Sequence, residues 1–392
     1  MTGGSGVRRE RSVYLDALRA VALVRVVLYH ATGWWWLTAF TAMPLMFFIA
    51  GTLFARSLER RSGLSVARDR YRRILLPYWV YLVAMVVLWG TLGLLGEISP
   101  AQWVGLLFPV LSTDGVAGPG AGTVVHLTWF ALWYLQMHLV LSALGPGLRR
   151  AQRSHPAVLW AIIVALGVVT APVAPALTIA IFYGACWVVG YHHADGSLDS
   201  WLDRHWRTTA LVCGPLGLAL FVGLHDGLPP VAAIGVVLLG AFWLSLALGL
   251  QPRIEPALAG HRTSAVVRWF SRRSLTVYLW HGAVLYFAVA APLPGGGTVV
   301  GNVAWCLVLL PVAALAVGWV EDVAARRRPQ LWPHTPRVVD LRATTATTAP
   351  TASPTSAPTT PTIAPTSGRF SAPAPVRPAP PGRPPAGPRG AR

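Results

Sequence analysis

Long apolar stretches alternate with short charged clusters along most of the chain. The stretches are roughly 17–23 residues long, the length that a helix needs to cross a hydrocarbon core about 30 Å thick. We therefore predict an all-α fold, a polytopic integral membrane helical bundle with ten transmembrane helices. The predicted spans cover residues 13–36, 38–56, 74–96, 127–145, 156–174, 176–193, 208–225, 229–250, 274–292 and 299–321.

The transmembrane domain, residues 13–324, has a segment on either side of it. Residues 1–12 are expected to be a cytoplasmic N-terminal segment, and residues 325–392 a cytoplasmic tail rich in Pro, Thr, Ala and Arg. The tail has too few large apolar residues to offset its chain entropy, so it is predicted to be disordered. Between the third and fourth spans, the apolar run Trp103 to Leu111 is too short to span and is predicted to be re-entrant or interfacial.

The distribution of arginine predicts the orientation of the spans. All 32 basic residues are arginine; 30 of them fall on one set of alternate loops and termini, and the opposite set holds none. The other two, Arg19 and Arg25, lie inside the first span. Because positive residues collect on the cytoplasmic side, we predict a multi-pass protein of the cell membrane with both termini cytoplasmic.

Composition excludes several other classes of protein. The chain has 392 residues, of which 54% are hydrophobic and 12% charged, whereas a soluble domain is about a quarter charged. The net charge of +18 does not indicate a nucleic-acid partner, because the arginines flank membrane segments and form no single patch. Cys186, Cys213 and Cys306 lie in different spans without CxxC spacing, which predicts packing residues with neither a disulfide nor a metal site.

Polar side chains inside the first span indicate a functional site, because ionisable groups are costly at membrane depth. Arg19 and His30 are eleven residues apart, so both point the same way from a helix, about 16 Å apart along its axis. Asp16 lies one turn before Arg19 on a neighbouring part of that face, and Arg25 is interpreted as structural. We expect a fixed cation toward the cytoplasm and a titratable base toward the exterior, both facing one cavity. Alternatively, Arg19 snorkels or pairs with Asp16, and His30 is an interfacial histidine.

Arginines also gather at the predicted cytoplasmic mouth of the third span, where Arg68, Arg70, Arg72 and Arg73 occur within six residues. Guanidinium forks match phosphate oxygens, so this cluster could clamp a phosphorylated ligand. On chemistry alone, an anchor of the positive-inside kind is the simpler interpretation.

The ninth span carries a polar stripe. Ser274, Tyr278 and His281 lie within about 60° of one another on a helix, and could form the hydrogen-bonding wall of a cavity. The alternative is a set of polar contacts that holds neighbouring helices together.

The fourth span carries an aromatic stripe. His126 and Trp133 share one side of it, and such a surface could either pack against neighbours or hold an acyl chain or sugar ring. His138 lies off that side and is predicted to be a core histidine.

Together these residues resemble the integral-membrane acyltransferase 3 family, whose members move acyl groups onto hydroxyls of sugars and other acceptors. The resemblance covers about residues 11–322. Arg19 followed by His30 is similar to the family's Arg-x10-His signature. Phe47 to Gly51 resembles a phenylalanine-rich segment that usually ends in Ser-Gly, but Ala50 replaces the serine, so any role of that hydroxyl is absent. Further similar segments are Arg70 to Arg72 with Pro77 to Trp79, Leu132 to Leu135, and Ser274 to His281.

The resemblance implies transfer of an acyl group, often acetyl, from cytoplasmic acyl-CoA to an acceptor hydroxyl, with CoA as co-substrate and no permanently bound cofactor or metal. His30 would act as general base, and Arg19 and Asp16 would be the other catalytic residues. A covalent acyl-histidine intermediate is an alternative to direct attack. The residues implied in donor binding are Arg70, Arg72 and Arg73, and those implied in substrate positioning are His126, Trp133, Ser274, Tyr278 and His281.

Two other functions compete with acyl transfer. A transporter or flippase could use Arg19 and His30 as substrate or proton-relay groups, and would favour broken helices at matching positions in two halves. Pro44 and Pro77 occur early in the chain, without a clear partner pair later. A membrane scaffold would instead recruit partners through the Pro-rich tail. The expected acceptor is a carbohydrate or glycolipid, and its identity and the acyl length stay open.

Overall fold

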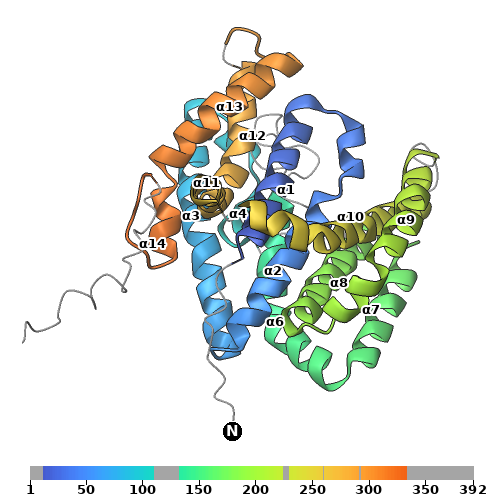
Figure 1. Cartoon of the computed structure of the whole chain (residues 1–392). Coiled ribbons are helices and arrows are strands. Elements are labelled where there is room, and N and C mark those ends of the chain that lie inside the picture. The colour runs from blue at the N-terminus through green and yellow to red at the C-terminus, as the bar shows by residue number, and fades with distance from the viewer. Residues whose placement is uncertain (1–11, 110–131, 224–228, 259, 291–292, 333–392) are drawn as a thin grey trace, which may run out of the picture. The chain divides into compact units, whose positions relative to one another are not determined.

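The structure is a computed structural model of the chain, and it describes residues 12–109, 132–223, 229–258, 260–290 and 293–332 (Figure 1). Every regular element within these ranges is a helix, so the predicted all-α class is confirmed. The described residues belong to a unit that covers residues 1–336, and residues 337–392 form a second unit. The predicted disordered tail therefore lies almost entirely outside the described residues.

Each predicted span overlaps a helix of the structure. The helices are α1 (Val13–Thr32), α2 (Ala42–Leu58), α3 (Gly63–Thr91), α4 (Pro100–Leu107), α6 (Trp133–Ser154), α7 (Pro156–Thr170), α8 (Pro175–Asp195), α9 (Asp199–Gly223), α10 (Pro229–Leu258), α11 (His261–Arg272), α12 (Ser274–Ala290), α13 (Val299–Ala316) and α14 (Trp319–Ala324). Short 3₁₀ helices occupy Trp35–Ala39 and Leu95–Glu97.

Within the described ranges, five helical segments are long and apolar enough to cross a membrane: Trp35–Leu58, Gly63–Thr91, Asp199–Gly223, Ile234–Leu258 and Val299–Ala316. Two shorter apolar helices, Pro156–Thr170 and Ser274–Val289, come close to this length. The fold is therefore that of a multi-pass membrane protein, and the count of ten spans stays a prediction.

Local sequence signals set the ends of α1. The Ser12 side chain accepts a hydrogen bond from the Leu15 amide at the N-terminus of the helix, which satisfies one of its otherwise unpaired donors. Gly33 ends the helix in the left-handed conformation, with φ of 68°, where a residue without Cβ carries no steric penalty. The length of α1 between these signals places Arg19 near one end and His30 in the last turn.

The run predicted to be re-entrant or interfacial forms α4 over its first residues. Ser99 and Gln102 make a reciprocal capping box at its start. The Tyr78 hydroxyl on α3 donates to the Leu106 carbonyl, and the Trp79 indole donates to the Leu107 carbonyl at 3.3 Å. These bonds hold α4 against α3, and the end of the predicted run lies outside the described residues.

Helices α2 and α8 cross at very short range, and glycines make the crossing possible. A Cβ added to Gly51 on α2 would overlap the carbonyl oxygen of Trp187 on α8. A Cβ added to Gly190 on α8 would likewise overlap the Phe48 carbonyl on α2. Small residues allow such close approach between membrane helices, where dispersion and not hydrophobicity drives association. The glycine that ends the Phe47–Gly51 motif is thus a packing residue.

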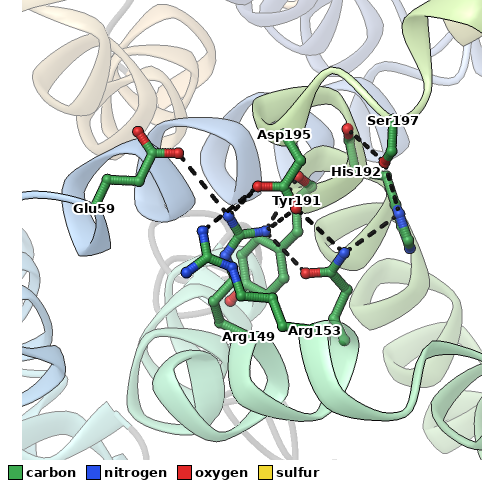
Figure 2. Close-up of polar contacts among 8 residues, drawn as sticks. Glu59, Arg149, Arg153, Tyr191, His192, Asp195 and Ser197 are labelled. Carbon is green, nitrogen blue, oxygen red and sulfur yellow. Dashed lines mark hydrogen bonds and ion pairs between the residues drawn. The ribbon is translucent and has the colours of Figure 1, made fainter. Parts of the chain in front are cut away.

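An ionic cluster joins α6 to α8 (Figure 2). Arg149, only 3% exposed, donates from Nη1 to Asp195 Oδ2 at 2.7 Å and from Nη2 to Asp195 Oδ1. Its Nη1 also donates to Gln152 Oε1 at 2.9 Å, and Glu59 of α2 lies 4.0 Å from Nη2. A buried guanidinium needs this set of acceptors, because burial of an unpaired charge is strongly unfavourable. This arginine of the predicted positive-inside set is therefore part of the scaffold.

The α2–α8 crossing can be tested with Gly51→Ala. The added methyl group meets backbone atoms, which cannot rotate away, so we expect a loss of about 1–3 kcal/mol of folding stability. The matched control is Gly167→Ala on α7, where a Cβ would find nothing within 4 Å. By helix propensity, that variant should be neutral or up to about 1 kcal/mol more stable. Thermal unfolding of the purified proteins in one detergent measures both, and equal stability of the two variants would contradict the crossing.

Candidate functional site

A basic cavity of about 190 Å³ lies among α1, α2, α3, α6, α11, α12 and the segment that contains α14. Five arginines and one carboxyl group line it together with polar and apolar side chains. The charged lining residues are Arg19, Arg70, Arg73, Arg272, Arg327 and Glu321. The structure thus brings Arg19 of the first span together with part of the arginine cluster of α3.

Helix geometry decides which arginines of α3 reach the cavity. Arg70 and Arg73 are three residues apart, so they share a face of the helix, and both line the cavity. Arg72 points elsewhere: its Nε donates to the Ala324 carbonyl at 2.9 Å, and its Nη2 lies 3.6 Å from Asp69 Oδ1. Arg72 is not among the lining residues, and its contacts attach α3 to α14.

Asp16 also lies outside the set of cavity-lining residues. Its carboxylate is 2% exposed and accepts a hydrogen bond from the Ser271 hydroxyl at 2.7 Å. This bond joins α1 to α11, one turn before Arg19. The observed contact favours a positioning role for Asp16.

A ladder of aromatic rings leads away from the cavity. Tyr134 and Tyr278 line the cavity, and their ring centroids are 5.1 Å apart. The Tyr278 ring lies 5.6 Å from the His281 ring, which in turn lies 5.2 Å from the His30 ring. His30 is not among the cavity-lining residues, so the structure relates Arg19 and His30 through this ladder rather than through that one cavity.

The two histidines of the ladder come from α1 and α12. His281 is fully buried, and its Nδ1 lies within hydrogen-bond distance of the Tyr278 carbonyl oxygen. Since a carbonyl can only accept, Nδ1 must carry the proton, and Nε2 of the neutral ring is the nitrogen able to accept one. The Tyr278 carbonyl therefore fixes the orientation and the tautomer of His281.

The other predicted site residues are placed as follows. Ser274 lines the cavity, and its hydroxyl donates to the Ser271 carbonyl at 3.0 Å. Trp133 does not line it and stacks on Tyr183 of α8 at 5.4 Å. Arg25 donates to the Leu37 carbonyl at 2.7 Å, in keeping with its structural interpretation. His126 lies outside the described residues.

Sequence reasoning did not assign Arg272, Arg327, Glu321 or His138 to a cavity wall. Arg327 was assigned to the tail and Arg272 to a loop, whereas His138, predicted to be a core histidine, lies in the cavity wall. Arg327 reaches the cavity because the chain turns back after α13, and its Nη2 lies 3.2 Å from Asp322 Oδ1. The signal available in the sequence was the run of three arginines after the last predicted span. An arginine run that only anchors a helix on the cytoplasmic side has the same pattern.

Glu321 is the carboxyl group of the cavity wall. It accepts hydrogen bonds from the Thr276 amide at 2.8 Å and the Thr276 hydroxyl at 2.6 Å, which caps the N-terminus of α12. Burial raises the pKa of Glu321 to about 7, although these hydrogen bonds and the nearby Arg273 favour its ionised form. Arg273, the residue before α12, donates a hydrogen bond to Asp322 at 2.8 Å. Two consecutive residues of α14 are thus bonded to the start of α12 and to the residue that precedes it.

These features define a helical membrane protein with a basic cavity on one side of a pair of histidine rings, His30 and the buried His281. A family model described as an acyltransferase domain matches residues 12–320. The chain therefore belongs to the acyltransferase 3 family, and it is a membrane acyltransferase. No curated protein and no solved structure matches the chain.

Ala50, where this sequence departs from the family pattern, places a methyl group in the wall of the cavity. Among the described residues, no group of His, Cys, Asp or Glu side chains could hold a metal ion.

The carboxyl group of Glu321 predicts a pH-dependent difference in stability. Its pKa in the folded protein is raised from the ordinary value of 4.5 to about 7. Burial of the protonated carboxyl group has no electrostatic cost at low pH, and folding stability is lost as the pH rises from about 4.5 through about 7. Wild-type protein should lose stability relative to Glu321→Gln over that range. Thermal unfolding of both proteins at several pH values measures the difference, with Asp203→Asn, at an exposed position on α9, as the control. A constant difference between wild type and Glu321→Gln would contradict the prediction.

Proposed function

We propose that the protein is an O-acyltransferase that moves an acyl group, in the first instance acetyl, from cytoplasmic acyl-CoA to a hydroxyl. The acceptor is a carbohydrate or a related cell-envelope or metabolite compound. One observation carries the proposal: a basic cavity and the pair of histidines, His30 and His281, lie at opposite ends of one ladder of rings. A phosphorylated donor needs a basic site, and a neutral acceptor hydroxyl needs a base that can take its proton.

The basic cavity supplies the donor site. Acyl-CoA carries several phosphates, and planar guanidinium groups bind phosphate oxygens in pairs. Arg19, Arg70 and Arg73 stand on two helices of the cavity wall and so approach a phosphate from different directions. Arg72 contributes by holding α14 in place.

The histidine pair supplies the base. His30 takes the proton of the acceptor hydroxyl as the oxygen attacks the thioester carbon, the C–S bond breaks, and the CoA thiolate leaves. His281, whose protonated Nδ1 is held by a backbone carbonyl, faces His30 and fixes its position. Tyr278 separates the two environments and is placed to donate a hydrogen bond to the developing oxyanion. Trp133 and His126 are proposed to contact the acceptor.

The proposed orientation follows from the arginine distribution. The loop before α3 and the segment after α14, both on the cavity side, carry the arginines, whereas the connection after α1 carries none. The cavity then opens toward cytoplasmic acyl-CoA, and the His30 end of α1 faces the exterior of the cell membrane.

The base assignment predicts a specific loss of activity. In His30→Gln, acyl transfer should fall roughly 10²–10⁴-fold in kcat, the usual contribution of a general base. The control His205→Gln changes an exposed histidine on α9 and should retain activity. Transfer from radiolabelled acetyl-CoA to envelope glycans in reconstituted vesicles is the measurement, with thermal unfolding to confirm the fold. Full activity of His30→Gln would remove His30 from the mechanism; movement of acceptor across the vesicle without acylation would favour a transporter.

The donor site predicts a selective effect on KM. In Arg70→Gln, the KM for acetyl-CoA should rise roughly ten- to a hundredfold, the value of one lost hydrogen bond to a charged group. The KM for S-acetylpantetheine, which has no phosphate, should change little. Arg68→Gln on an exposed position of the same helix is the matched control. An equal effect on both donors would assign Arg70 a structural role.

A further inference from the structure

A long apolar groove lies between α9 and α10, away from the basic cavity. Its volume is about 760 Å³, and its walls include Leu211 and Leu218 of α9 and Phe242 and Leu246 of α10. Leu211 and Leu218 are 75% and 47% exposed, so the groove is open along one side. Among the described residues that line it, Arg207 is the charged one.

The groove starts where α9 changes from polar to apolar. Arg207 is the last charged residue of α9, and residues 208–223 carry no charge. In a membrane helix, such a boundary lies at the level of the lipid headgroups. The groove then follows α9 as far as Leu218, about 16 Å at 1.5 Å per residue. That length matches half of a hydrocarbon core about 30 Å thick, so the groove covers one leaflet.

Beyond Arg207 the walls of the groove are apolar. Trp243 and Ala39 are among the lining residues, and the Trp243 indole N–H donates to the Ala39 carbonyl at 2.8 Å. Phe40 packs edge-on against the same indole at 4.5 Å. Because this indole N–H already has its acceptor, a ligand finds an apolar surface along the groove and a cation at its Arg207 end, the mouth of the groove.

Close packing on either side shapes the groove and holds its cation. Gly214 lacks a Cβ where the Phe242 ring lies, and Gly249 lacks one where the Trp206 ring lies. The Arg207 Cζ sits 5.4 Å from the centroid of the Trp206 ring. A guanidinium over an indole face is restrained by a cation–π interaction, so the positive charge stays at the mouth of the groove.

We propose that this groove binds an anionic glycerophospholipid, with the phosphate at Arg207 and one acyl chain along α9 and α10. The one cation among the described lining residues, the length of one leaflet and the apolar walls together fit this occupant. A zwitterionic lipid would bring its own cation to Arg207 and gain less from the site. The site is separate from the proposed donor cavity, so either proposal can fail without the other.

The test uses the full chain in nanodiscs of phosphatidylcholine with one-fifth phosphatidylglycerol, followed by native mass spectrometry of retained lipid. Wild type should retain phosphatidylglycerol in preference to phosphatidylcholine. Arg207→Gln should weaken that retention about fivefold, the value of one basic residue at an anionic surface. Arg207→Lys, which keeps the charge, should retain most of the preference. Leu218→Trp, which fills the groove with an indole, should lower retention of both lipids.

Arg204→Gln is the matched control, because Arg204 is exposed on the same helix and does not line the groove. An equal loss in Arg204→Gln would show that general surface charge holds the lipid, and would overturn the proposal. Equal retention of the two lipids by wild type would overturn it as well. So would cross-linking between two chains through Leu211→Cys, since a second copy would then cover the groove. The Arg207 pair keeps the test decisive if Leu218→Trp does not fold.

Discussion

The concentration of positive charge inside a membrane bundle is the constraint on which the rest of this structure depends. Each buried guanidinium loses several kcal/mol of hydration, and like charges in one cavity repel each other in a medium of low dielectric constant. Glu321 in the wall and Asp322 beside Arg327 offset part of this charge. The surplus that remains on the wall favours a polyanionic ligand, as the proposed function requires.

Such a cavity keeps its shape only if the helices around it are fixed. The Asp16–Ser271 bond fixes α1 on α11, and Arg72 attaches α3 to the carbonyl at the end of α14. Arg273 attaches the start of α12 to Asp322. The α2–α8 crossing brings the backbones of these two helices into contact, so the helices cannot move closer together. Asp16 and Arg72, which sequence reasoning assigned to catalysis and to donor binding, thus make contacts that join helices around the cavity.

The sequence alone was sufficient for the fold class, for the family and for the approximate position of the helices that overlap the predicted spans. Apolar length reports helices directly, and Arg19 with His30 is a recognisable pair. The sequence was not sufficient to separate Arg72 from Arg70 and Arg73, because that distinction depends on which face of α3 meets α14. It also could not place Arg272, at the end of α11, or Glu321 and Arg327, which lie in α14 and directly after it. Finally, the helical period of α1 predicted that Arg19 and His30 share one face. It could not predict the tyrosines between the cavity and His30, because these come from α6 and α12.

The cavity also has a consequence for how the protein is made. Its wall combines Arg19, from the first helix to be synthesised, with Glu321 and Arg327, from the last residues of the folded unit. During translation, a nascent chain that lacks the final helices therefore has an incomplete wall and no bonds from α14 to α12. The wall of the basic cavity can be completed only after the ribosome has passed residue 327.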